Sequence, residues 1–191
     1  MQLTTDRLLL REFEERDWEA VLAYQSDPLY LRYYAWTQRT EADVREFVGW
    51  FLKQQLERPR IKFQLALVLK AEGRLIGNCG VRVKDTNLRG GDIGYELDSR
   101  YWGHGYATEA AQEIVRFGFE ELGLQRIWAE CVAENIGSAR VLEKVGMRQE
   151  GYLTEKEYYK GRWWHQRLFA VLDREWKSFK GQSAETEKSN S

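Results

Sequence analysis

The spacing of hydrophobic positions changes several times along the chain, and each change predicts a new element. A short apolar run at residues 8–13 predicts a first strand. Apolar residues then recur at helical spacing after Asp17, and they do so again from Val44 onward. Thr40 and Asp43 form an acidic variant of the capping box, which places the start of the second helix there. The N-terminal part is therefore expected to contain one strand and two helices.

The middle of the chain contains strand-like runs followed by one helical face. Apolar runs at residues 63–69 and 75–83 are separated by a short gap with a glycine, which predicts a β-hairpin. A further strand at residues 92–97 leads into a helix, whose apolar face runs from Ala107 to Val115. This strand and helix are joined by a glycine-containing loop, which makes the junction a candidate for binding.

The C-terminal part alternates strands and helices in the same way. Its pattern predicts a strand at residues 126–132, a helix at 136–145, and a final hairpin at 147–159 and 162–172. Helices separate the strands only after an antiparallel hairpin, so the order favours a mixed sheet over a purely parallel one. We therefore predict a mixed α/β (α+β) fold, with a mostly antiparallel sheet of about seven strands flanked by about four helices.

Length and composition indicate one domain without a strong surface field. The 191 residues are 43% hydrophobic, which is enough for a single core, and we assign the domain to residues 1–178 and a polar tail to residues 179–191. The 29 Lys and Arg nearly balance the 30 Asp and Glu, so neither nucleic acid nor a membrane is expected as a partner. The sequence contains neither a signal peptide nor an apolar run long enough to span a membrane, so we expect a cytoplasmic protein.

The cysteines and histidines do not form a pattern typical of a metal site. Cys79 and Cys131 are far apart, and each lies within a strand-like run, so both are predicted to be buried structural thiols. The two histidines, His104 and His165, are not spaced as zinc ligands. We therefore predict no metal. Cys131 has no base at a visible spacing, so packing is also favoured over a role as a nucleophile.

The loop Gly103-His104-Gly105 lies between a predicted strand and a predicted helix, where free backbone N–H groups and the helix dipole favour a phosphate. A Walker loop would need a lysine after the glycines, and a dinucleotide fingerprint would need a small third residue where Thr108 stands. Both alternatives therefore fail at a named position. The two glycines alone would equally suit a tight structural turn between strand and helix.

A family resemblance adds to this interpretation. Arg100-x-x-Gly103-x-Gly105, followed by residues 106–110, resembles the coenzyme A signature of the GNAT superfamily of N-acetyltransferases. Residues 3–11 and 135–147 and the end of the last hairpin resemble the ribosomal-protein N-acetyltransferase branch, the RimJ and RimL type. The resemblance covers nearly all of the predicted domain. It implies acetyl-CoA as cosubstrate and a splay between the fourth and fifth strands, into which the pantetheine arm enters.

The resemblance also implies which residues contact the cofactor. Backbone N–H groups of residues 101–106 are expected to hold the pyrophosphate, and the strand around residues 94–97 is expected to pair with the pantetheine amides. A backbone N–H near Glu96 or Leu97 would then support the oxyanion that forms at the thioester. The cofactor contacts implied in this way are Tyr95, Leu97, Arg100, Tyr101, Trp102, Gly103, His104, Gly105, Tyr106, Ala107, Thr108 and Asn135.

Two residues are candidates for catalysis. Glu96 lies on the splayed strand and is the candidate base, acting directly or through water, because an amine must lose its proton before it attacks. The alternative is an outward-facing glutamate paired with an arginine. Many family members use a helix tyrosine to protonate the thiolate, but Leu142 stands at that position. Ser138 is the alternative thiol contact in the ribosomal branch, although a serine after the helix cap Asn135 is also ordinary.

The acceptor is predicted from aromatic residues. Tyr33, Tyr34 and Trp36 lie in a loop that covers the acceptor in this family, and Trp164 on the last hairpin is expected to face them; core packing is the alternative for each. We expect acetyl transfer from acetyl-CoA to a primary amine by direct attack in a ternary complex. The acceptor is a protein N-terminal amine or, alternatively, a polyamine or aminoglycoside. A catalytically silent acyl-CoA-binding module is the alternative from another class, and the sequence does not indicate the oligomeric state.

Overall fold

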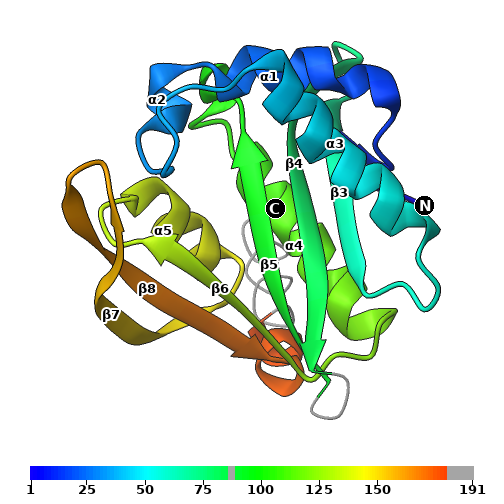
Figure 1. Cartoon of the computed structure of the whole chain (residues 1–191). Helices are drawn as coiled ribbons and strands as arrows, with labels where there is room; N and C mark the ends of the chain where they lie inside the picture. The colour runs from blue at the N-terminus through cyan, green and yellow to red at the C-terminus, as the bar shows by residue number, and fades with distance from the viewer. Residues whose placement is uncertain (86–88, 180–191) are drawn as a thin grey trace.

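The fold is built on one sheet, which the computed structural model describes together with its helices over residues 1–85 and 89–179. Eight strands of this part of the chain are ordered β1-β2-β3-β4-β5-β6-β8-β7 (Figure 1). All neighbouring pairs are antiparallel except β5 and β6. The strands are β1 Gln2–Thr4, β2 Leu8–Arg11, β3 Lys62–Leu69, β4 Arg74–Asp85, β5 Gly90–Leu97, β6 Arg126–Val132, β7 Arg148–Tyr159 and β8 Arg162–Leu172. The predicted mixed fold is confirmed; β1 is the additional strand, and three residues are too few to show a period.

Helices lie on both faces of the sheet. They are α1 Trp18–Gln25, α2 Pro28–Leu31, α3 Glu41–Leu56, α4 Tyr106–Glu120 and α5 Ile136–Lys144, with short 3-10 helices at Glu15–Asp17 and Ser99–Tyr101. Residues 173–179 are also helical. Figure 1 shows α1 and α3 in front of β3 and β4, and α4 behind them. The capping box at Thr40 is confirmed, since Asp43 N–H donates to Thr40 Oγ1 (3.2 Å) and Thr40 N–H to Asp43 Oδ2 (2.8 Å).

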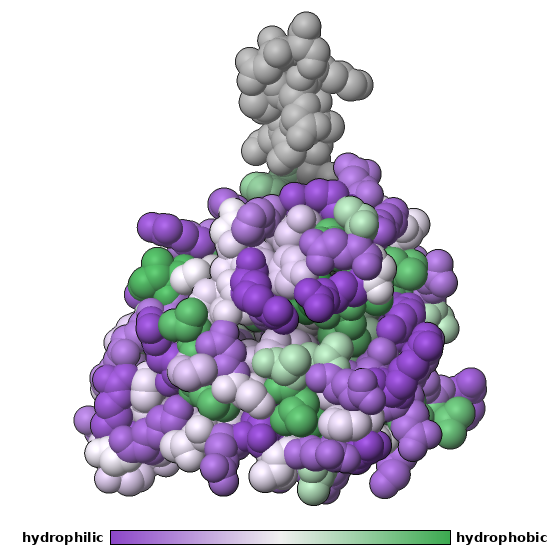
Figure 2. All heavy atoms as spheres, turned by 90° about the horizontal axis from the view of Figure 1, so that it is seen from above, coloured by the Kyte–Doolittle hydropathy of each residue, from purple (hydrophilic) through white to green (hydrophobic). Residues whose placement is uncertain are grey.

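The two faces of the sheet bury separate hydrophobic clusters. Side chains alternate between the faces of a strand, so Leu65 and Leu67 of β3 pack with α4, whereas Ala66 packs with α1 and α3. Figure 2, viewed from the end that carries α1 and α2, shows the exposed apolar residues as small separate groups among polar ones. The larger cluster extends below α4 and α5 and includes Leu142. It therefore spans the region where the family resemblance places the cofactor.

The strands β5 and β6 separate soon after they begin. They pair in parallel only over Gly90–Asp92 and Arg126–Trp128, and Figure 1 shows them diverging beyond these residues. The predicted splay between the fourth and fifth strands of the sequence pattern is confirmed. Residues 93–97 of β5 consequently pair with β4 along one edge and leave their other edge open to the splay.

Both cysteines are free and buried, as predicted, and burial raises the pKa of Cys79 to about 12. The proposed domain ends at residue 178; of the tail assigned to residues 179–191, all but Phe179 lies outside the described residues. No described helix is long and apolar enough to cross a membrane.

The larger cluster is expected to supply most of the stability. Leu67→Ala should lower the free energy of unfolding by about 2–5 kcal/mol, because Leu67 is fully buried and its loss leaves a cavity. Leu56→Ala is the matched control: Leu56 is 79% exposed, and the effect should stay within about 0.5 kcal/mol. Urea unfolding measures both values, and equal losses would contradict this assignment of the core.

Candidate active site

The loop between β5 and α4 is shaped by two glycines in the left-handed region. Gly103 has φ +81° and Gly105 has φ +83°, which side chains of L-residues rarely adopt. Among the described residues, no side chain caps the start of α4, which begins at Tyr106 directly after Gly105. The first N–H groups of the helix are thus left for another acceptor, and with the helix dipole they suit an anion.

Arg7 brings a positive charge to this loop, a contribution that the sequence analysis missed. Its guanidinium donates to the His104 carbonyl (NH1 to O, 2.9 Å) and to Glu109 (Nε to Oε2, 2.6 Å), and it lies 4.5 Å from the ring centre of Tyr106. Thr5 Oγ1 also donates to Glu109 (2.5 Å). Arg7 and Thr5 therefore fasten the turn between β1 and β2 to the first turn of α4. The resemblance of residues 3–11 to the opening strand of the family was the available signal.

A cavity of about 550 Å³ lies at the same place. It is lined by Asp6, Arg7, Gly105, Thr108, Glu109, Gln112 and Lys144. Arg7 and Lys144 are cationic, and Lys144 comes from the end of α5, so two distant segments supply positive charge beside the uncapped helix start. Asp6 and Glu109 line the same cavity, and Arg7 pairs with Glu109, so the uncapped N–H groups of α4 are the main feature here that favours an anion.

Other residues of the predicted signature have their side chains engaged elsewhere. Arg100 donates to Asp98, and Tyr101 donates to Glu72 (2.6 Å). His104 donates to Trp102 O through Nδ1 (2.8 Å) and stacks on Tyr106, and Ala107 packs against the larger core. The side chains of Arg100 and Tyr101 thus do not line the cavity, and their backbone N–H groups are also engaged, with Asp98 Oδ1 (3.0 Å) and Asp98 O (2.9 Å).

The open edge of β5 presents the backbone of Leu97 to the splay. Asp98 N–H bonds to Ile76 O on β4 (2.8 Å), and successive N–H groups of a strand point to opposite edges, so Leu97 N–H points away from β4. The Trp102 indole donates to Leu97 O (2.9 Å) from the same side. Of the two backbone groups considered for an oxyanion, Leu97 N–H faces the splay and Glu96 N–H faces β4.

Tyr95 reaches across the splay to α5. Its hydroxyl donates to the Ser138 carbonyl (3.0 Å) and lies 2.9 Å from Ser138 Oγ. Asn135 caps α5 by accepting from Ser138 N–H (3.1 Å). Burial raises the pKa of Cys131, while Ser138 and Arg167 act in the opposite direction, so the nearby thiol is poorly ionised and suits packing better than nucleophilic attack. Two hydroxyl groups therefore meet between the splayed strands, and Leu142 stays buried below them.

Glu96 lies on the opposite side of β5 from Tyr95, facing α1 and the aromatic loop. Four donors reach its carboxylate: Asn78 Nδ2 (2.9 Å), Gln25 Nε2 (3.0 Å), Tyr24 OH (3.2 Å) and Tyr34 OH (3.4 Å). Glu96 is thus held by amides and phenols rather than by an arginine. Burial, and secondarily the charge of Glu96, raises the pKa of Tyr24 and of Tyr34, which keeps both phenols protonated as donors. Tyr24, Gln25 and Asn78 were not predicted as site residues.

The aromatic loop connects the two halves of the splayed sheet. Tyr34 stacks on Trp36 (4.8 Å between ring centres) next to Glu96. Tyr33 turns the other way: its hydroxyl donates to Glu134 O (3.2 Å), and its carbonyl accepts from Tyr159 OH (3.0 Å). Trp164 lies edge-on to Tyr33 but is only 5% exposed and donates to Tyr159 O, so it packs rather than lining an open surface. Tyr34 and Trp36 are the predicted acceptor residues nearest Glu96.

Comparisons with known proteins agree with this geometry. A family model described as an acetyltransferase (GNAT) domain matches residues 7–148. YnaD, an uncharacterized N-acetyltransferase of Bacillus subtilis (strain 168), is 39% identical over 92% of this chain and 99% of its own length. A GNAT-family acetyltransferase structure from Bacillus anthracis has 36% identity and a TM-score of 0.80, covering 91% of this chain and 99% of that one. A ribosomal-protein alanine acetyltransferase from Vibrio fischeri shares the fold alone (24% identity, TM-score 0.75, covering 92% and 98%).

The contacts of Glu109 predict a pH-dependent stability. Burial opposes ionisation of Glu109, but the hydrogen bonds from Thr5 and Arg7 outweigh it and lower its pKa. A lowered folded-state pKa contributes stability that is complete above the unfolded value of about 4.3 and is lost as pH falls through the folded value. Glu109→Gln should therefore be less stable than wild type at pH 7, and this difference should shrink at pH 3. Urea unfolding at both pH values measures it.

Glu41→Gln is the control for this measurement. Glu41 forms an exposed pair with Arg45 one helical turn away (2.7 Å), and such pairs contribute little. Its effect should be small at both pH values. A Glu109→Gln deficit of equal size at pH 7 and pH 3 would contradict the ionic contribution of the contact between Arg7 and Glu109.

Proposed function

The chain belongs to the GNAT family of acetyltransferases, and on that premise we propose that it transfers acetyl from acetyl-CoA to a primary amine by direct attack in a ternary complex. The observation that carries the proposal is the position of β5. One edge of β5 is open to the splay, and Glu96 and Tyr95 lie on its two faces. The strand ends shortly before the glycine loop at residues 103–105, which precedes α4.

The residues present fit a coenzyme A ligand. Backbone N–H groups of residues 103–106 at the start of α4, with Arg7 and Lys144 nearby, would hold the phosphates. The N–H groups of Tyr101 and Trp102, also expected there from the sequence, instead donate to Asp98 O and Ser99 O. The open edge at Tyr95 and Leu97 would pair with the pantetheine amides, and Asn135 would border them from the start of α5. When bound, acetyl-CoA supplies an activated acyl group whose thioester carbonyl accepts the amine.

Each proton transfer then has a candidate group. Glu96 accepts the proton that the amine must lose, directly or through water. Leu97 N–H, which points into the splay, stabilises the oxyanion as the nitrogen attacks. The new amide bond forms as the carbon–sulfur bond breaks, and the leaving thiolate takes a proton from the Ser138 hydroxyl, which lies 2.9 Å from Tyr95 OH and is reprotonated from solvent. Ser138 contacts the sulfur, and Tyr95 orients the serine hydroxyl.

A protein N-terminal amine is the acceptor that the charges favour over a polyamine or aminoglycoside. Residues 29–40 contain Arg32 and Arg39 but no aspartate or glutamate. The hairpin tip adds Lys160 and Arg162, of which Arg162 pairs with Glu134. A polycationic acceptor would meet like charges at this loop, whereas a single amine next to Glu96 would not. The silent binding module is supported only by Leu142, and turnover with any amine would remove it.

Binding of acetyl-CoA is the first expected outcome. Calorimetric titration should show saturable binding to wild type and none to Gly105→Glu, because the new side chain strains a left-handed position and repels the pyrophosphate. Gly123→Glu is the matched control. Gly123 is also left-handed (φ +65°) with open space around it, and it lies beyond the far end of α4. It should bind like wild type; absence of wild-type binding would overturn the proposed function.

The acceptor class is expected to follow the charge of the aromatic loop. A peptide with a free N-terminal amine should give a higher kcat/KM than spermidine in wild type. Arg32→Glu should raise kcat/KM for spermidine by about two- to fivefold, since Arg32 is exposed on the loop beside Tyr33. A thiol-release assay with both acceptors measures this change. Preference of the wild type for spermidine would favour the small-molecule alternative.

A further inference from the structure

The donors around Glu96 are distributed unequally between its two oxygens. Oε2 accepts from Asn78 Nδ2, Gln25 Nε2 and Tyr24 OH at 2.9–3.2 Å, whereas Oε1 has Tyr34 OH at 3.4 Å. Gln25 and Asn78 are almost completely buried, at 0% and 2% exposure. One carboxylate oxygen is therefore fixed from three sides, and the other is left with a long contact on the side of the aromatic loop.

A first chain of hydrogen bonds sets the orientation of Gln25. Arg39 Nε donates to Gln25 Oε1 (3.0 Å), and an arginine can only donate. The amide oxygen of Gln25 must therefore face Arg39, which turns its NH₂ group toward Glu96. Arg39 itself is held by the face of Trp36 (4.8 Å) and by the Asp43 carbonyl (3.3 Å).

A second chain sets the orientation of Asn78 across three strands. Asp92 holds Arg82 through Nε (3.0 Å) and NH2 (2.6 Å), and Arg82 NH1 donates to Gln64 Oε1 (3.4 Å). Gln64 Nε2 then donates to Asn78 Oδ1 (2.6 Å), so the NH₂ group of Asn78 is the end that reaches Glu96. As in the first chain, an arginine at the outer end fixes the direction of every bond up to the carboxylate.

Two glycines make room for this second chain on the sheet. A Cβ at Gly80 would lie 2.3 Å from the Phe63 carbonyl oxygen and 2.5 Å from Gln64 Oε1, so both the close strand and the side chain exclude one there. A Cβ at Gly94 would lie 3.0 Å from Arg82 NH2. Gly80 stands between Asn78 and Arg82 on the same face of β4, and Gly94 stands between Asp92 and Glu96 on that face of β5. The long polar side chains of the neighbouring strands lie over these two gaps.

We propose that Arg39 and Arg82 are positioning residues for the acetyl transfer. Through Gln25, and through Gln64 and Asn78, they fix Oε2 of Glu96 and leave Oε1 to accept the proton of the incoming amine. The inference rests on the proposed function of Glu96 as the base. The titratable or charged groups that face Glu96 are Tyr24 from α1, Tyr30 and Tyr34 from α2 and the loop after it, and the two arginines at the outer ends of the chains.

Gln64→Met tests the second chain without adding a charge. Methionine keeps the length of the side chain but cannot donate to Asn78, so the Asn78 amide is free to turn and Glu96 loses an oriented donor. The expected result is a fall in kcat of about tenfold, with the KM and Kd for acetyl-CoA unchanged. The acidic limb of the pH profile of kcat/KM for the amine should move to higher pH, because the charged form of Glu96 loses a donor.

Gln55→Met is the matched control. Gln55 is a partly buried glutamine of α3 whose Nε2 donates to Phe13 O (3.0 Å), outside both chains. It should leave both kcat and the acidic limb unchanged. If Gln64→Met and Gln55→Met behave alike while wild type acetylates an amine, the positioning role is overturned and the proposed function stands.

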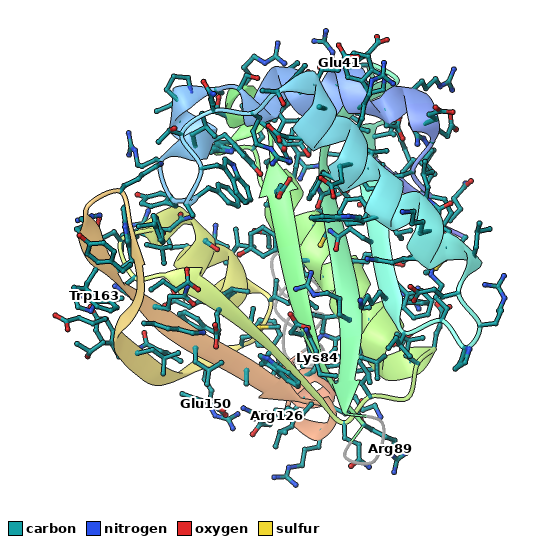
Figure 3. All side chains as sticks on the ribbon, in the orientation of Figure 1. Glu41, Lys84, Arg89, Arg126, Glu150 and Trp163 are labelled. Atoms are coloured by element: carbon teal, nitrogen blue, oxygen red, sulfur yellow. The ribbon has the colours of Figure 1, made fainter. Side chains whose placement is uncertain are left out.

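A second variant guards against loss of folding at the buried Gln64. Arg82→Met removes the outer end of the chain at a half-buried position and should give the same changes with smaller size. Its control is Arg126→Met. Arg126 is a half-buried arginine at the start of β6, and it pairs with Glu150, away from Glu96 (Figure 3). Thermal unfolding of all four variants identifies any that do not fold.

The positioning role and the proposed function fail on different results. An unchanged kcat in both Gln64→Met and Arg82→Met, with wild type active, overturns the positioning role. Absence of turnover in wild type with peptides and polyamines alike would instead overturn the proposed function.

Discussion

The rest of the structure depends on the loss of pairing between β5 and β6 after three residues of each strand. An unpaired strand edge inside a sheet leaves backbone donors and acceptors without partners, which is costly unless other groups meet them. Here the Trp102 indole satisfies the carbonyl of Leu97, and the Tyr95 side chain spans the opening to the start of α5. The opening is therefore maintained by specific side chains on both sides, as a binding site would require.

Because side chains alternate along a strand, the splay also separates two kinds of chemistry. Tyr95 and Leu97 pack toward α4 and α5 beside Ser138, whereas Glu96 between them faces α1 and the aromatic loop. A thioester lying along the open edge would thus have hydroxyl groups on one side and a carboxylate on the other. The contacts of Tyr33 with Glu134 and Tyr159 join the two halves again at the same end.

The sequence was sufficient for the order of the elements and for the position of the glycine loop before α4, because both depend on local patterns. The strand β1 has only three residues, too few to show a hydrophobic pattern. Arg7 was assigned only to the opening strand and not to the site. Glu96 was proposed as the base from its place on the splayed strand, but its partners Tyr24 and Gln25 lie more than seventy positions away along the chain. Which polar side chains converge on a carboxylate is decided by tertiary packing, and no spacing rule reports it. Trp164 is a different case: the sequence left open whether it faces the acceptor or packs in the core, and its burial favours packing.

Stability alone gives little reason for the polar chain that ends at Glu96. Burying Gln64, Asn78 and Gln25 costs desolvation, and hydrogen bonds between such groups recover little more than that cost. Two glycines at neighbouring strand positions add a further cost, because glycine weakens a strand interior. Apolar side chains could fill the same space on the sheet, and they have no hydrogen-bonding groups that must find a partner. A network that carries these costs, with an arginine at each outer end and one carboxylate at the centre, is consistent with the proposal that it holds that carboxylate in one orientation.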